Sequence, residues 1–139
     1  MFITSSDLST GVYPEIKNTL ARSSEAFILT ACKTAERELE SYLSKRYLIR
    51  PELEKPIEER DTLLVMLCRD IAIYHLYAPA ETLPAKVVKR YDDAIRVLGN
   101  YAEGIISLPG VPSAPDPEAG TPDGDQIGFG SRPPRALLV

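Results

Sequence analysis

Histidine and cysteine, which serve in many catalytic and metal-binding sites, are scarce in this chain. Its 139 residues include one histidine, His75, and two cysteines, Cys32 and Cys68. A nucleophile needs a base and an orienting group, and a zinc site needs several suitably spaced ligands. The sequence shows neither, so it predicts no enzyme, no metal and no cofactor. His75 has no suitable same-face neighbour and is interpreted as structural, and the cysteines as small buried residues in a reducing compartment.

Long apolar runs and a strong net charge are also missing. No run of about 18 apolar residues occurs, and the N-terminus lacks the basic stretch and apolar run of a signal peptide. The net charge of −4 gives no strong signal for binding a polyanion. Gly128-Phe129-Gly130 lacks a lysine and a following helix, so it is not a phosphate-binding loop. These absences predict a protein made in a cytosol, with no membrane partner.

Helical patterns dominate residues 1–108, which we predict to form one all-α body. Residues 4–7 offer capping side chains for a short first helix that Gly11 ends, and Pro14 opens a second short helix to about residue 21. Ser23 or Ser24 then caps a long helix that runs to about residue 46. The apolar side chains of this helix fall within about 120° of arc, which is typical of a helix that buries one face.

Two further long helices are predicted after a proline-bracketed loop over residues 47–56. The first runs from about residue 57 to residue 78, and 13 of its last 16 residues are apolar and point in every direction. A helix that is apolar all round is buried all round, so it lies in the centre of the bundle or forms a subunit interface. The last long helix begins at Pro84 and reaches about Glu103, with Gly104 as its C-terminal cap.

The chain changes character at Pro109. Residues 109–139 contain 7 prolines and 5 glycines in 31 positions, with no helical or strand period, yet they end in apolar residues. We therefore divide the chain into a helical body, residues 1–108, and an extended irregular arm, residues 109–139. The arm is expected to order only when it meets a partner. Its candidate interface residues are Phe129, Arg132, Leu137, Leu138 and Val139.

The apolar helix carries charged residues whose burial is costly. A buried Asp70 needs a partner, and Arg46, Arg69 or a tyrosine hydroxyl could supply one. We interpret Asp70 as part of a buried or interfacial ion pair that fixes the register of the helix. Together with Arg69, Ile73 and Tyr77 it forms the candidate interface of the body.

A basic stripe on the last long helix suggests an alternative function. Its members lie away from the apolar face: Lys86, Lys89, Arg90 and Arg96. If they contact DNA phosphates, the protein is a helical adaptor that binds nucleic acid, although two neighbouring aspartates reduce the positive field. A solvated helix face and contact with an acidic partner surface are the other interpretations.

Several blocks of sequence, in their order and spacing, resemble a family of phage proteins. The blocks are YLSKRY at residues 42–47, CRDIAIYHLY at residues 68–77, and RYDDAIRVL at residues 90–98, followed by GIISL at residues 104–108. The start FITSSDL at residues 2–8 and the FGSR at residues 129–132 add to the pattern. With these blocks the chain resembles the Mu-like prophage small structural protein family, the head–tail joining or neck proteins of tailed bacteriophages.

This resemblance implies an α-helical connector subunit without enzymatic activity. It implies that copies assemble into a ring between portal and tail, through which the genome passes. The partners are then further copies of the chain and portal or tail-completion proteins, with only transient passage of DNA. The resemblance also implies a place in the virion, after synthesis and assembly in the bacterial cytoplasm.

Overall fold

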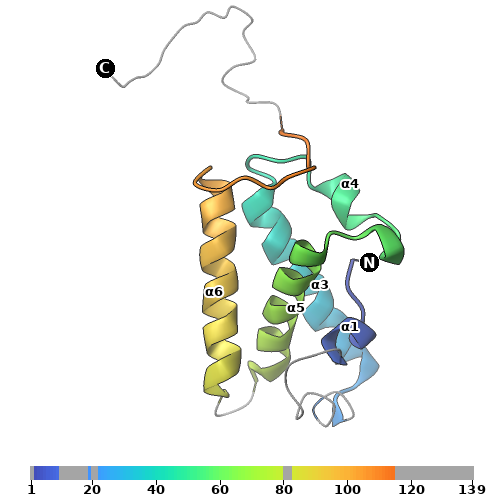
Figure 1. The fold of residues 1–139 in the computed structure, drawn as a ribbon. Helices are drawn as coiled ribbons and strands as arrows, with labels where there is room; N and C mark the ends of the chain where they lie inside the picture. Colours follow the sequence, from blue (N-terminus) through green and yellow to red (C-terminus); the bar gives the residue numbers. More distant parts are fainter. Residues whose placement is uncertain (1, 10–18, 20–21, 80–82, 115–139) are drawn as a thin grey trace, which may run out of the picture.

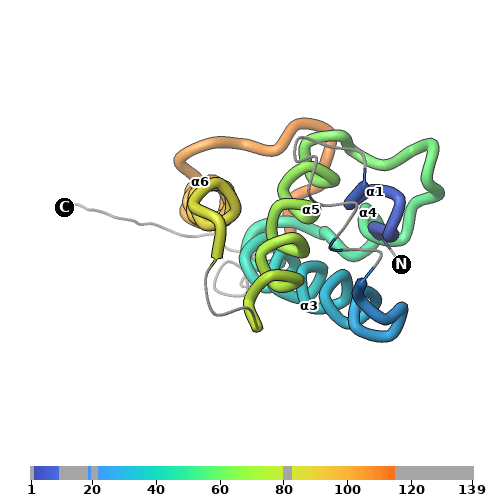
Figure 2. The backbone as a smooth tube through the Cα atoms, turned by 90° about the horizontal axis from the view of Figure 1, so that it is seen from below, coloured from blue at the N-terminus to red at the C-terminus, as the bar shows by residue number. Residues whose placement is uncertain are grey.

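The computed structural model describes residues 2–9, 19, 22–79 and 83–114. Its elements are α1 (Ser5–Ser9), α3 (Glu25–Leu43), α4 (Arg50–Leu53), the 3-10 turn η1 (Ile57–Glu59), α5 (Thr62–Tyr77) and α6 (Ala85–Ala102). The three long helices pack against one another, with α3 in contact with both α5 and α6, and α1 lies on the side away from α6 (Figure 1; Figure 2). The predicted all-α class is confirmed. The short helix expected after Pro14 lies outside the described residues.

Helix α3 follows its amphipathic pattern. Of the two candidate serines, Ser24 is the N-cap, and its hydroxyl accepts a hydrogen bond from the backbone N–H of Phe27 at 3.1 Å. The helix ends at Leu43, and a turn carries the chain on to Arg46. Its buried stripe consists of Ile28, Ala31, Cys32, Ala35, Leu39 and Leu43.

Helix α5 begins at Thr62, so the prediction of a start near residue 57 is wrong. Asp61 caps the helix, because its carboxylate accepts from the backbone N–H groups of Leu63 and Leu64 at 2.9 and 3.1 Å. The expected loop contains α4, since Pro51 fits the first turn of a helix, where its missing N–H costs nothing. Helix α5 packs against α1, α3 and α6, and this central position explains its apolar residues on all sides.

Helix α6 has the predicted ends. Pro84 is its N-cap, and Gly104 follows its last turn with φ +78°, a conformation that favours glycine. The guanidinium of Arg46 crosses this end and donates to the carbonyls of Ala102 at 3.0 Å and Glu103 at 3.3 Å. A Cβ atom at Gly104 would lie 2.7 Å from the guanidinium carbon of Arg46. The positive φ therefore favours glycine here, and a larger residue would also displace the flexible end of Arg46 from its position over the helix end.

The first six residues of the predicted arm, residues 109–114, lie against the body. The backbone N–H of Leu48 donates to the carbonyl of Pro112 at 2.9 Å, and that of Ala114 donates to the carbonyl of Arg46 at 2.8 Å. In Figure 1 this orange segment crosses the end of the bundle above α3 and α5. The part of the chain that packs as a body thus extends to Ala114. All five arm candidates lie outside the described residues.

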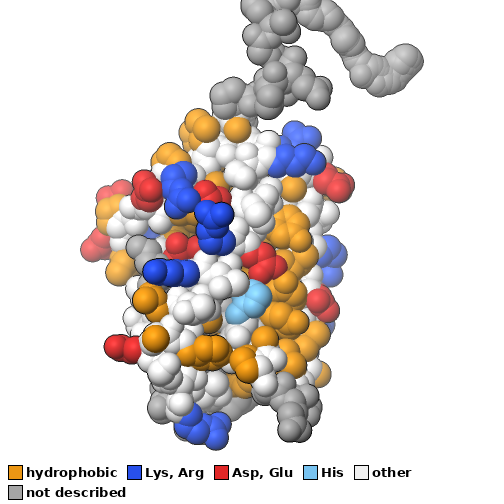
Figure 3. Space-filling model, turned by 180° about the vertical axis from the view of Figure 1, so that it is seen from behind, with side chains coloured by type: hydrophobic (Ala, Val, Ile, Leu, Met, Phe, Trp, Pro, Cys, Tyr) orange, Lys and Arg blue, Asp and Glu red, His pale blue; other side chains and the backbone are white. Residues whose placement is uncertain are grey.

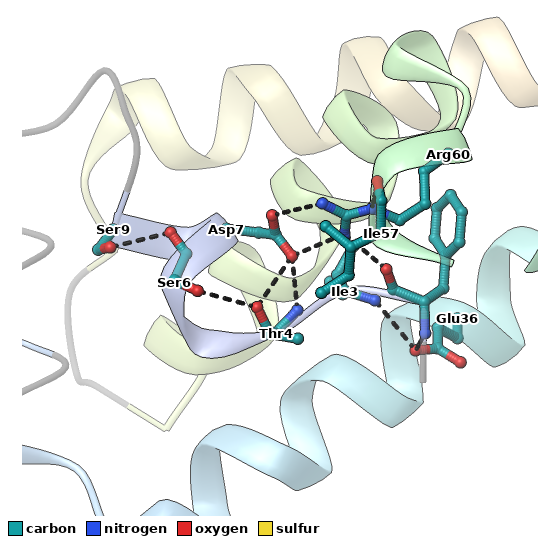
Figure 4. Close-up of polar contacts among 9 residues, drawn as sticks. Ile3, Thr4, Ser6, Asp7, Ser9, Glu36, Ile57 and Arg60 are labelled. Carbon is teal, nitrogen blue, oxygen red and sulfur yellow. Dashed lines mark hydrogen bonds and ion pairs between the residues drawn. The ribbon is translucent and has the colours of Figure 1, made fainter. Parts of the chain in front are cut away.

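The N-terminal segment is inserted into the core. Phe2, Ile3 and Leu8 are all 0% exposed. The backbone N–H of Phe2 donates to the carboxylate of Glu36 on α3 at 2.6 Å, and its carbonyl accepts from Arg60 at 2.7 Å (Figure 4). These bonds fasten the start of the chain to α3 and to the residues that lead into α5.

Candidate functional site

The four candidate interface residues of α5 differ in their surroundings. Arg69 and Asp70 adjoin each other and are largely buried, and the Arg69 Nε lies 4.0 Å from an Asp70 carboxylate oxygen. Ile73 is 3% exposed, so its side chain belongs to the core of a single copy. Tyr77 is half-buried, and its hydroxyl accepts a hydrogen bond from the Thr19 hydroxyl at 3.0 Å.

Asp70 lines a groove between α5 and α6. The residue is 7% exposed, and its second carboxylate oxygen is 3.9 Å from an Arg90 nitrogen. Both arginine contacts are longer than hydrogen bonds. Burial raises the pKa of Asp70, and Arg69 and Arg90 counteract this. The expected ion pair therefore forms with Arg69 and, from the next helix, Arg90, whereas Arg46 is engaged at the end of α6.

The groove is lined by both apolar and charged side chains. Its volume is about 550 Å³. The apolar lining residues are Met66, Leu67, Ala94 and Val97, and the charged ones, besides Asp70, are Lys86, Lys89, Arg90 and Asp93. A lining of this kind fits a short peptide with both apolar and charged side chains.

Carboxylates accompany most of the predicted basic stripe. Asp93 pairs with Lys89 at 3.2 Å and with Arg96 at 2.9 Å. Arg90 reaches Asp70, as described above, and Lys86 lines the groove. This pairing lowers the positive field that contact with nucleic acid requires, so no observation favours the alternative function.

A polar cluster that the sequence did not reveal joins the three long helices. The carboxylate of Glu38 on α3 accepts from the Tyr91 hydroxyl of α6 at 2.5 Å and contacts the His75 Nε2 of α5 at 2.8 Å. The rings of Tyr74 and Tyr91 stack with centroids 3.9 Å apart. Burial, and then the bond to Glu38, raise the pKa of Tyr91. Figure 3 shows the histidine at the surface of this face, beside a band of hydrophobic side chains.

Replacing Glu38 by glutamine is expected to lower the free energy of unfolding by about 2 kcal/mol, because two hydrogen bonds to a charged, half-buried acceptor are weakened. Urea denaturation followed by circular dichroism measures the change. The matched control is Glu40→Gln, whose carboxylate pairs with Arg50, a side chain that is 54% exposed. That control should lose less than about 0.5 kcal/mol. Equal losses in the two variants would contradict a structural role for the cluster.

The part of the chain that the structure describes contains no cluster of metal-binding residues and no reactive thiol. Within it, no three residues of the types His, Cys, Asp and Glu come close enough to hold a metal ion. Nor does any helix there have the length and apolar character needed to cross a bilayer. Cys32 and Cys68 are free and buried, as predicted. Burial raises the pKa of Cys32 to about 11 and raises that of Cys68 too, so neither thiol is poised as a thiolate.

These features define a small helical-bundle protein whose described residues offer grooves and charged pairs rather than a catalytic arrangement. A family model described as Bacteriophage Mu, Gp36 matches residues 3–125. The chain therefore belongs to the Bacteriophage Mu Gp36 family and is a phage structural or assembly protein. The sequence-based resemblance to Mu-like phage proteins is thus confirmed, although the match ends before the FGSR segment. No curated protein and no solved structure matches the chain.

Proposed function

We propose that this protein is a head–tail connector subunit of a phage or prophage, which acts in the virion by oligomerisation and docking and catalyses no reaction. The observation that carries the proposal is the family match over residues 3–125, which includes almost the whole helical body. Its partners are further copies of the chain, in a ring, and the portal or tail-completion proteins on either side.

One end of the bundle has the apolar surface that docking requires. Large hydrophobic side chains are exposed there: Leu48 at 45%, Ile105 at 66% and Ile106 at 38%. They follow the ends of α3 and α6, close to the point where residues 109–114 cross the body (Figure 1). Apolar side chains grouped in this way support contact with another protein.

Deleting the gene from an inducible prophage tests the proposed function. We expect electron microscopy to show DNA-filled heads separate from tails, and a plasmid copy of the gene to restore joined particles. Joined, infectious particles without the gene would overturn the connector proposal. Loss of the heads themselves would overturn it as well, because a connector acts after the heads have formed.

We also propose that the candidate interface residues of the arm anchor the subunit to a neighbouring component, and a chain that ends at Ala114 tests this role. This end point keeps the two backbone bonds of residues 109–114 to the body, so the thermal melt should match that of the full chain. We expect the truncated protein to restore at least about tenfold fewer joined particles, since the loss of a few anchor side chains removes much of the energy of an interface. Equal restoration by both chains would show that the arm is dispensable.

A further inference from the structure

The groove between α5 and α6 is complementary to an acidic turn on the opposite side of the molecule. We propose that the turn formed by residues 54–59 of one copy binds in the α5–α6 groove of a second copy. Ile57 then lies against the apolar lining, and the glutamates of the turn lie beside the cationic side chains of the groove. The inference rests on the proposed function, which requires contact between copies, and it adds the two surfaces that make this contact.

The 54–59 turn presents one large apolar side chain among acidic ones. Ile57 begins η1 and is 61% exposed. Lys55, the one cation of the turn, pairs with the buried Glu52 at 3.0 Å. The acidic residues of the turn are exposed and form no ion pair within the part of the chain that the structure describes: Glu54, Glu58 and Glu59. The turn therefore offers a partner an apolar anchor in a negative field.

The α5–α6 groove has more positive than negative charge. Three cationic side chains and two carboxylates line it. Asp93 pairs with both Lys89 and Arg96, whose side chains are 76% and 67% exposed, and one carboxylate neutralises only one of two cations. Pairs as exposed as these are also weak in water. Asp70 likewise lies between two arginines. The charge of the groove therefore favours an acidic occupant.

The apolar lining of the groove suits Ile57. Met66 is 37% exposed, and Leu67, Ala94 and Val97 line the same groove, whose volume is about 550 Å³. Contact between Ile57 and Met66 removes the exposed apolar surface of both side chains from water. An apolar anchor surrounded by glutamates thus matches an apolar lining surrounded by cations.

The position of the two surfaces favours contact between copies. The green segment between α4 and α5, which contains the 54–59 turn, lies at the edge of the molecule opposite to α6 (Figure 1; Figure 2). The turn therefore faces away from the groove of its own copy. Contact between two unlike surfaces leaves a turn open on one copy and a groove open on the other, so further copies add head to tail. Such an interface generates a ring when the rotation between copies closes.

Thiol cross-linking of the full chain tests the contact. Pro56→Cys places a thiol beside Ile57, and Met66→Cys places one in the groove, whereas the native cysteines are buried. A short bis-maleimide accumulates product even from weak association, which is expected of so small a contact. We expect the concentrated chain with both changes to give a ladder of multimers, and a mixture of the two single variants to stop at dimers linked between positions 56 and 66. The unchanged chain should give no product, and dimers alone from the doubly changed chain would contradict head-to-tail contact.

A change at Ile57 tests the apolar anchor. In the mixture of single variants, Ile57→Ser should lower the yield of the 56–66 cross-link at least about fivefold. The matched control is Ile105→Ser, which changes an isoleucine of similar exposure, 66%, at the end of the bundle. This control should leave the yield unchanged. Equal yields from the two variants would show that Ile57 does not anchor the contact.

An exchange of charge tests the electrostatic part of the contact. Glu58→Lys on the Pro56→Cys chain and Lys89→Glu on the Met66→Cys chain should each lower the yield roughly tenfold, because like charges then meet. The two changes together should restore part of the yield. Both side chains are exposed, so thermal melts of the variants should match that of the unchanged chain. Equal yields with and without these changes would overturn the proposal.

Phage particles distinguish a failure of this inference from a failure of the proposed function. The doubly changed chain is supplied to the prophage deletion, and the joined particles are treated with the same reagent. We expect multimers of the chain linked between positions 56 and 66. Joined particles that depend on the gene but lack this cross-link, or that link position 66 to another protein, would overturn the inference and leave the connector function in place. Joined particles without the gene would overturn the connector function instead.

Discussion

Replacing Phe2 by alanine is expected to lower the free energy of unfolding by about 3–4 kcal/mol. The side chain is 0% exposed and lies in the same buried cluster as Ile3 and Leu8. Hydrogen bonds to Glu36 and Arg60 hold the backbone of Phe2 on both sides, so the chain has little freedom to collapse into the space that the ring leaves. Urea denaturation followed by circular dichroism measures the loss.

Phe27 provides the matched control. It lies outside the buried stripe of α3 and is 36% exposed, so Phe27→Ala removes the same ring from a position that solvent already reaches and leaves no enclosed cavity. We expect a loss of less than about 1 kcal/mol. If Phe2→Ala were as mild as Phe27→Ala, the N-terminal segment would not be part of the folded core in solution.

The three long helices could be predicted because their signals are local. A continuous 3.6-residue pattern predicts α3 and α6. Residues typical of helix ends, at Ser23 or Ser24, Pro84 and Gly104, place three of the ends of these helices. The start of α5 was misplaced because the apolar pattern does not distinguish η1 from the helix that follows it. Asp61, a good capping residue, was the signal that marks the true start.

The tertiary contacts could not be read from local patterns. Two apolar residues before a short helix form no period, so nothing marked Phe2 and Ile3 as core residues. Glu36 lies outside the buried stripe of α3, yet it accepts the Phe2 N–H because the N-terminal segment passes along that side of the helix. Helical spacing identifies neighbours on the same helix only. It therefore does not reveal that His75 contacts Glu38, which lies on α3.

The same limit applies to the candidate site. The cost of burying a carboxylate correctly indicated that Asp70 needs a cation. Which cation it contacts depends on the alignment of α5 with α6, which brings Arg90 within 3.9 Å. Arg46, the other candidate, follows α3 and binds the carbonyls at the end of α6. Sequence chemistry thus identified the residue that needs a partner, and helix packing determined the partner.

The ion pair between Asp7 and Arg60 should make the stability of this protein depend on pH in the acidic range. The Arg60 guanidinium donates to both oxygens of Asp7, at 2.8 and 3.0 Å, and the two side chains are only 11% and 15% exposed. The Thr4 N–H donates to the same carboxylate at 2.7 Å, which completes the cap of α1 (Figure 4). We expect Asp7→Asn to lower the free energy of unfolding by about 2–3 kcal/mol at neutral pH.

The hydrogen bond from Arg60 holds the pKa of Asp7 below its usual value, and burial opposes this only in part. A carboxylate whose pKa is lower in the folded state contributes stability above its unfolded pKa, near about 4, and loses it as the pH falls through the folded pKa. The difference in unfolding free energy between the wild type and Asp7→Asn should therefore be constant from neutral pH to about pH 5 and shrink below about pH 4. Urea denaturation across this range measures the difference, with the exposed Asp92→Asn as the control that should show none. A difference that stays unchanged under acid conditions would mean that the ionised carboxylate of Asp7 does not hold the N-terminal segment in place.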